Sequence, residues 1–203
     1  MKERSVVEDE RVSLRRNLFV TGRPGVGKTT LIEKVLERLD VRAGGFYTRE
    51  IREGGKRVGF SIVGMDGERG VLAHVGIESE HRVGKYGVDR EDLERVGVAA
   101  LESAIEEADL VVMDEIGRME LCSPLFRDAV IRALDCPGPV LGTIQDRSNE
   151  FLDGVRSRDD VSVVRVTEEN RDELADALAD AVGKTLAADA RGPRDAEGGG
   201  NVS

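Results

Sequence analysis

The chain has 203 residues, a length that suits one α/β domain with a core of its own. Its net charge of −10 argues against a general nucleic-acid-binding protein, because contacts to a phosphate backbone need a basic surface. The two cysteines and two histidines show no Cys-x-x-Cys spacing, so they predict no zinc site and suit a reducing cytosol. No apolar run is long enough to cross a bilayer. We therefore expect a cytoplasmic protein with neither a membrane nor a nucleic-acid partner.

The folded part is predicted to be a single domain over residues 17–188. Residues 1–16 carry mixed charges with little periodicity and are interpreted as a loose arm. Residues 189–203 contain a run of glycines and predict a disordered tail. We expect a monomer, with an oligomer left open.

The first predicted strand, residues 18–20, leads into a match to G-x-x-x-x-G-K-[ST] at every fixed position. A helix predicted over residues 30–39 completes the strand–loop–helix context of a phosphate-binding (Walker A) loop. Glycines let backbone amides turn toward a polyphosphate, and the start of the helix favours the same anion. We expect Lys28 to reach the β- and γ-phosphates and Thr29 to bind Mg²⁺. The residues expected to bind nucleotide here are Gly22, Arg23, Pro24, Gly25, Val26, Gly27, Lys28, Thr29 and Thr30.

Three short segments after this helix predict an antiparallel meander, inserted over residues 45–75. They are residues 46–51, 57–63 and 70–75, and Gly-Gly and Asp-Gly turns separate them. The alternative is a plain extension of the main sheet. Residues 82–89 are polar and rich in glycine, which predicts a loop that could lie near a ligand.

The rest of the chain alternates between strands and helices. Strands are predicted over residues 110–113, 140–144 and 161–166, with helices over 93–105, 124–134 and 171–182. This alternation predicts an α/β fold with a mostly parallel sheet covered by helices on both faces. Ligands of such sheets bind beyond the carboxyl ends of the strands, where all the candidate residues lie.

Two acidic residues follow the apolar run 110–113. Asp114 stands where a second Mg²⁺ contact (Walker B) belongs, and we expect it to act through a metal-bound water. Glu115 is expected to orient or deprotonate the attacking water. This adjacency favours an ATPase that carries its own base over a small kinase, which uses the hydroxyl of an acceptor. The expected catalytic residues are Lys28, Asp114 and Glu115, and the expected metal ligands are Thr29 and Asp114.

Thr143, on the next strand, is a candidate sensor of the γ-phosphate or the lytic water, and equally an ordinary β-branched strand residue. Charge on the transferred phosphoryl group calls for an arginine. The candidates are Arg118, Arg147, Arg156, Arg158 and Arg171, and each is also typical of a surface position.

The residues 114–117 also fit D-x-x-G, the acidic element of switch GTPases. No guanine-recognising N-K-x-D follows Thr143, so a guanine-specific switch protein is not supported. The missing guanine-recognition motif favours loose selection of the base.

Several segments together resemble the THEP1-type, or cancer-related, nucleoside-triphosphatase family. They are the phosphate loop and residues 45–48, 54–60, 82–86, 114–121, 141–144 and 167–171. The resemblance implies a RecA-like core and Mg²⁺-dependent hydrolysis of ATP, GTP and other nucleoside triphosphates. It also implies a second nucleotide-binding segment, formed by Leu110, Val111, Val112, Met113, Asp114, Glu115, Ile116 and Gly117. Arg118 stands where many members have lysine.

The sequence therefore predicts an enzyme that hydrolyses ATP, GTP, CTP and UTP to the diphosphate and phosphate, with Mg²⁺ and broad base specificity. Two alternatives remain open. One is a nucleotide-dependent phosphotransferase, and the other is a nucleotide-gated regulatory protein in which slow hydrolysis acts as a timer.

Overall fold

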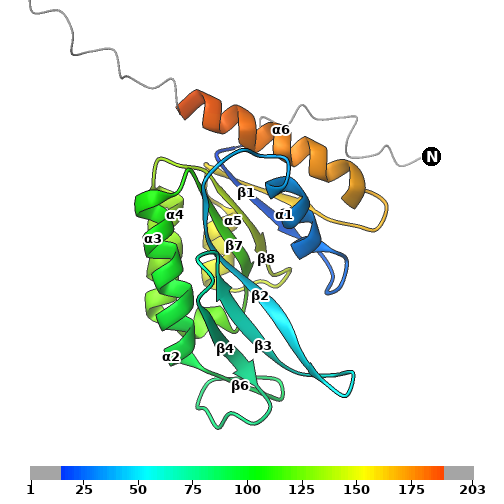
Figure 1. Cartoon of the computed structure of the whole chain (residues 1–203), viewed down its shortest axis with the longest axis vertical. Helices are drawn as coiled ribbons and strands as arrows, with labels where there is room; N and C mark the ends of the chain where they lie inside the picture. Colours follow the sequence, from blue (N-terminus) through cyan, green and yellow to red (C-terminus); the bar gives the residue numbers. More distant parts are fainter. Residues whose placement is uncertain (1–14, 190–203) are drawn as a thin grey trace, which may run out of the picture.

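The computed structural model describes residues 15–189, so the predicted arm and tail lie almost wholly outside the described residues. Within this range the chain forms a nine-stranded sheet with strand order β5-β6-β4-β3-β2-β7-β8-β1-β9 and helices on both faces (Figure 1). The predicted α/β class is confirmed. No helix of the described range is long and apolar enough to span a bilayer.

One half of the sheet is parallel. It consists of β2 (Ala43–Glu53), β7 (Leu110–Ile116), β8 (Val140–Ile144), β1 (Asn17–Thr21) and β9 (Val161–Arg165). β1 and β8 are short, apolar and buried along their whole length, as expected for strands covered on both faces. The carboxyl ends of the parallel strands meet at one edge, which brings together the phosphate loop after β1, the acidic pair of β7 and Thr143 of β8.

The other half is antiparallel and continuous with the first. The first five residues of β2 pair in parallel with β7, and the remainder pairs with β3 (Lys56–Gly64). The sheet continues through β4 (Arg69–His74) and β6 (Tyr86–Val88) to β5 (Arg82–Val83). The predicted meander is thus an extension of the main sheet, and it reaches residue 88 rather than 75.

The prediction of a loop over residues 82–89 was wrong, because this segment forms β5 and β6. Tyr86 and Val88 are buried, and the ring of Tyr86 packs edge-on against Phe60 with centroids 5.3 Å apart. β6 pairs with β4, and this ring contact ties it to β3 as well, at the side of the sheet opposite β9 and away from the phosphate loop. Polar and glycine residues hid two short strands whose apolar residues alternate.

Helices α1 (Lys28–Leu36) and α6 (Arg171–Asp189) cover one face of the sheet (Figure 1). The π-helical turn η1 (Leu93–Val98), α3 (Ala99–Glu107), α4 (Pro124–Asp135) and α5 (Glu150–Arg156) cover the other. The short helices α2 (Arg90–Asp92) and η2 (Glu120–Cys122) precede η1 and α4. Helix α1 begins two residues before the predicted range 30–39 and ends three residues before the last residue of that range. Helix α5 was not predicted, although Asn149 caps it by accepting a hydrogen bond from the Leu152 amide at 2.8 Å.

Two hydrophobic clusters lie on opposite faces of the sheet. Alternate residues of β1 supply both, since Leu18 and Val20 face α1 and α6 whereas Phe19 faces the α3–α5 layer. In the second layer, Phe46 and Phe126 meet edge-to-face at 5.5 Å between ring centroids. Packing on both faces fixes the strands and therefore the edge at which their carboxyl ends meet.

Candidate active site

The phosphate loop turns sharply between β1 and α1. Gly25 and Gly27 have φ angles of 79° and 102°, in the left-handed region that favours glycine. Gly27 is the N-cap of α1 and supplies no side-chain hydrogen bond to the first turn. The amides at the start of α1 therefore have no capping side chain and can bind an anion.

Lys28 links this loop to β7. Its Nζ donates a hydrogen bond to the Gly22 carbonyl at 3.2 Å and lies 3.3 Å from Glu115 Oε2. Both charged side chains are largely buried, with 11% and 26% of their surfaces exposed. The structure therefore brings together the predicted phosphate-binding lysine and the predicted base.

Asp114 is 2% exposed and sits beside the loop. Its Oδ1 accepts a hydrogen bond from the Thr143 hydroxyl at 2.6 Å. Burial raises the pKa of Asp114, and the Thr143 hydroxyl, the neighbouring Thr29 hydroxyl and the Lys28 charge offset this only in part. Thr143 thus orients Asp114, and its contact with the γ-phosphate or the lytic water stays a prediction.

The second carboxylate oxygen of Asp114 fits a metal. Oδ2 is buried and has no hydrogen-bond partner within the described residues. An unpartnered carboxylate oxygen next to a threonine hydroxyl suits Mg²⁺, which prefers oxygen ligands. In residues 15–189 no cluster of three or more His, Cys, Asp or Glu could hold a metal. Phosphate and water oxygens would have to complete its coordination.

Two residues that the sequence analysis missed lie beside Glu115, around Gly117. A Cβ at Gly117 would stand 3.2 Å from Glu120 Oε2, 3.3 Å from Glu115 Oε1 and 3.4 Å from Gln145 Nε2. Glu120 accepts a hydrogen bond from the Gly117 amide at 3.0 Å. Gln145 Oε1 is buried without a hydrogen-bond partner in the described part of the chain. The fold brings Gln145 to the acidic pair from the end of β8, whereas Glu120 lies close by in the chain and no motif marks it.

The carboxyl groups of this cluster bind protons more tightly than usual. Burial raises the pKa of Glu115, while the charge of Lys28 lowers it in part. Burial and the nearby Glu115 and Asp114 raise the pKa of Glu120 to about 8. A raised pKa brings Glu115 closer to the range in which a carboxylate is an effective general base.

Of the five candidate arginines, Arg171 lies against the phosphate loop. Its Nη1 donates to the Val26 carbonyl at 3.3 Å, and its side chain lies beside Gly27. Arg118, directly after the acidic segment, is exposed and makes no hydrogen bond or ion pair within residues 15–189.

Two further candidates, Arg156 and Arg158, lie at opposite ends of the parallel strands. Arg156 donates to the backbone oxygens of Gln145 and Arg147, at the carboxyl end of β8. The side chain of Arg158 binds Asp160 at 2.8 Å, just before β9 begins. Arg158 therefore lies at the amino ends of the parallel strands, opposite the phosphate loop, and the prediction that it lies at the site was wrong.

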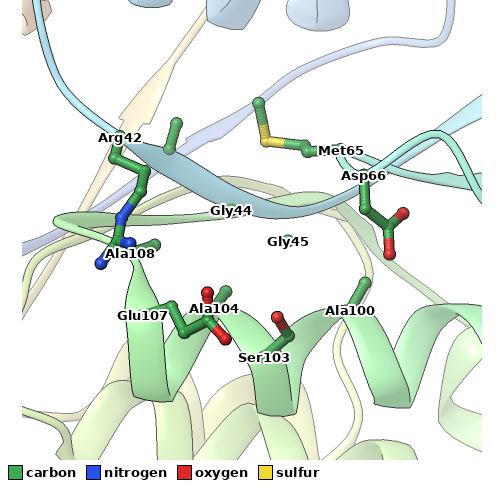
Figure 2. Close-up of a pocket in the computed structure, with 11 residues that line it drawn as sticks. Arg42, Gly44, Gly45, Met65, Asp66, Ala100, Ser103, Ala104, Glu107 and Ala108 are labelled. Atoms are coloured by element: carbon green, nitrogen blue, oxygen red, sulfur yellow. The ribbon is translucent and has the colours of Figure 1, made fainter.

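A separate hollow lies on the same side as the amino ends of the parallel strands, between the start of β2 and α3 (Figure 2). It has a volume of about 180 Å³, and Gly44 and Ala104 line it, with Arg42, Asp66 and Glu107 at its rim. It is remote from the phosphate loop and contributes nothing to this site.

Comparison with known proteins places this geometry among nucleotide-hydrolysing enzymes. The model of the family described as NTPase matches residues 17–179. The nucleoside-triphosphatase THEP1 of Thermotoga maritima is 50% identical over 157 residues, covering 77% of this chain and 90% of the relative. The human cancer-related nucleoside-triphosphatase is 44% identical over 177 residues, covering 79% of this chain and 93% of the relative.

Two solved structures share the fold. The crystal structure of THEP1 from Aquifex aeolicus has a TM-score of 0.73 at 36% identity and covers 80% of this chain and 96% of its own. The solution structure of the human cancer-related nucleoside triphosphatase has a TM-score of 0.72 at 41% identity and covers 83% and 98%.

Proposed function

This chain belongs to the NTPase family, and we propose that it hydrolyses nucleoside triphosphates to the diphosphate and phosphate, with Mg²⁺ and broad base specificity. The observation that carries the proposal is the contact of Lys28 with Glu115, 3.3 Å apart at the mouth of the phosphate loop. It puts a phosphate-binding cation and a water-activating carboxylate at one point. The names of the related proteins support the same activity.

Each residue of the site has a distinct task in this proposal. The loop amides and Lys28 bind and neutralise the phosphates. Thr29 and Asp114 would hold Mg²⁺, which would supply positive charge to neutralise the phosphates. Thr143 keeps Asp114 oriented through its hydrogen bond. Glu115 takes a proton from the attacking water, whose oxygen bonds to the γ-phosphorus as the diphosphate leaves.

Hydrolysis is favoured over the two alternatives because Glu115 is present as a base within the site. A phosphotransferase would transfer the γ-phosphoryl group to an acceptor and would release no free phosphate without one. A regulatory protein would bind nucleotide tightly and turn it over negligibly. Broad base specificity is supported by the absence of an N-K-x-D motif from the sequence. The cytoplasmic location and the monomeric state stay predictions.

Phosphate release from ATP, GTP, CTP and UTP, with Mg²⁺ and with excess chelator, tests the proposal on the purified chain. We expect release from all four without an added acceptor, values of kcat/KM within about tenfold of one another, and loss of activity with chelator. Lys28→Ala should abolish release, whereas Lys56→Ala, an exposed lysine of the β2–β3 hairpin, should not. Phosphate release that needs an acceptor, or that is unchanged by Lys28→Ala, would overturn the proposal.

A further inference from the structure

A cleft opens beside the phosphate loop, between the beginnings of α1 and α6. Its volume is about 280 Å³, and its lining consists of Gly27, Thr30, Leu31, Lys34, Arg171 and Asp172. Gly27, Thr30, Leu31 and Lys34 are spaced at i, i+3, i+4 and i+7, so they form one face of α1. The cleft is therefore continuous with the phosphate loop along the helix.

The orientation of a bound triphosphate follows from the site already described. The γ-phosphate end is fixed where Lys28 meets Glu115 and where Asp114 lies. A chain of phosphates that begins there and follows the loop amides leaves over Gly27 and Thr30, at the first turn of α1. The nucleoside attached to the α-phosphate then meets the α1–α6 cleft.

Arg171 forms a flat wall of this cleft. Its Nη1 is held by the Val26 carbonyl at 3.3 Å, and its Cδ and Nη1 lie 3.8 and 3.9 Å from the position that a Cβ on Gly27 would take. The side chain thus lies against the loop itself. A planar guanidinium stacks on aromatic faces, and every nucleobase presents such a face.

The polar groups at the rim of the cleft do not define a base. Lys34 and Asp172 pair with each other at 3.1 Å, with 42% and 75% of their side-chain surfaces exposed. Exposed charges of this kind can adapt to different base edges, whereas discrimination needs buried groups that only one base can satisfy.

We propose that the α1–α6 cleft receives the nucleoside of the substrate and that Arg171 stacks on its base, giving affinity for nucleosides of every base. This proposal rests on the proposed function and names a residue of the same site that binds the nucleoside. It assigns Arg171 to the nucleoside end of the substrate, away from the γ-phosphate and from the role of an arginine that stabilises transition-state charge.

Steady-state kinetics with ATP, GTP, CTP, UTP and inorganic tripolyphosphate test this proposal. Arg171→Ala should raise KM for all four nucleotides by about tenfold, to similar extents, with kcat retained. Its KM for tripolyphosphate should match that of the wild type. Arg171→Lys keeps the charge without the planar group and should resemble Arg171→Ala. Arg38→Ala is the matched control, because it removes an ion pair between the turn after α1 and α6, 2.7 Å to Asp176, outside the cleft. It should leave KM unchanged.

Three results would overturn the assignment of Arg171. They are unchanged nucleotide KM in Arg171→Ala, an equal rise for tripolyphosphate, and full rescue by Arg171→Lys. Failure of the proposed function itself would look different, because the wild-type protein would then release no phosphate from any of the five substrates.

Discussion

Glu120 provides a quantitative test of the buried acidic cluster. Burial and the neighbouring carboxylates raise its pKa from 4.5 to about 8. Below pH 4.5 the folded and unfolded chains both carry the proton, so the stabilisation is fully present. Between 4.5 and about 8 only the folded chain holds it, so the free energy of unfolding falls as the pH rises. The linked free energy is on the order of 5 kcal/mol across this interval.

Replacing Glu120 by Gln removes this titration and keeps an oxygen that can accept from the Gly117 amide, an interaction of 3.0 Å in the structure. The stability of Glu120→Gln relative to the wild type should therefore increase steadily from about pH 5 to pH 8. Urea unfolding of both proteins at closely spaced pH values measures this difference. Glu106→Gln, at an exposed glutamate of α3, serves as the control and should show no such trend. A difference between Glu120→Gln and wild type that is constant with pH would refute the reasoning.

Other expected outcomes concern the backbone and Asp114. A Cβ on Gly45, whose φ is 118°, would stand 2.1 Å from the Val112 oxygen, so Gly45→Ala should cost about 3 kcal/mol or more in urea unfolding. Gly154→Ala, in α5 with nothing within 4 Å of the new Cβ, should instead stabilise by about 0.5–1 kcal/mol. Thr143→Val removes the hydrogen bond to Asp114 and should raise the Mg²⁺ concentration for half-maximal activity by about tenfold, whereas Thr143→Ser should retain the wild-type value. Equal Mg²⁺ dependence in both Thr143 variants would exclude the orienting role.

The sequence was sufficient for the parts of the site whose chemistry is local. The phosphate loop is a continuous segment, and its glycines and lysine mark it without reference to the rest of the fold. Asp114 and Glu115 could also be predicted from the sequence. The continuous apolar run before them predicts a buried parallel strand, and ligands bind beyond the carboxyl ends of such strands. The structure confirms that these segments lie together.

The sequence alone could not identify site residues whose position depends on packing between distant segments. Gln145, just after β8, reaches Gly117 only because β7 and β8 are neighbours in the sheet. Glu120 is close to Gly117 along the chain, and it is the burial of its side chain that depends on the fold. Arg158 was misplaced because helix α5, which was not predicted, carries the chain from the end of β8 back to the start of β9. Asp160, just before β9, holds the Arg158 side chain at the amino ends of the parallel strands, away from the loop.

The central claim is that Glu115 activates water at a phosphate site formed by the loop and β7. The most direct test compares phosphate release and nucleotide binding in Glu115→Gln, with Glu106→Gln as the control. We predict that Glu115→Gln binds a non-hydrolysable ATP analogue with a Kd within about threefold of the wild-type value while its turnover falls by about 10²-fold or more. Wild-type turnover in Glu115→Gln would contradict the account.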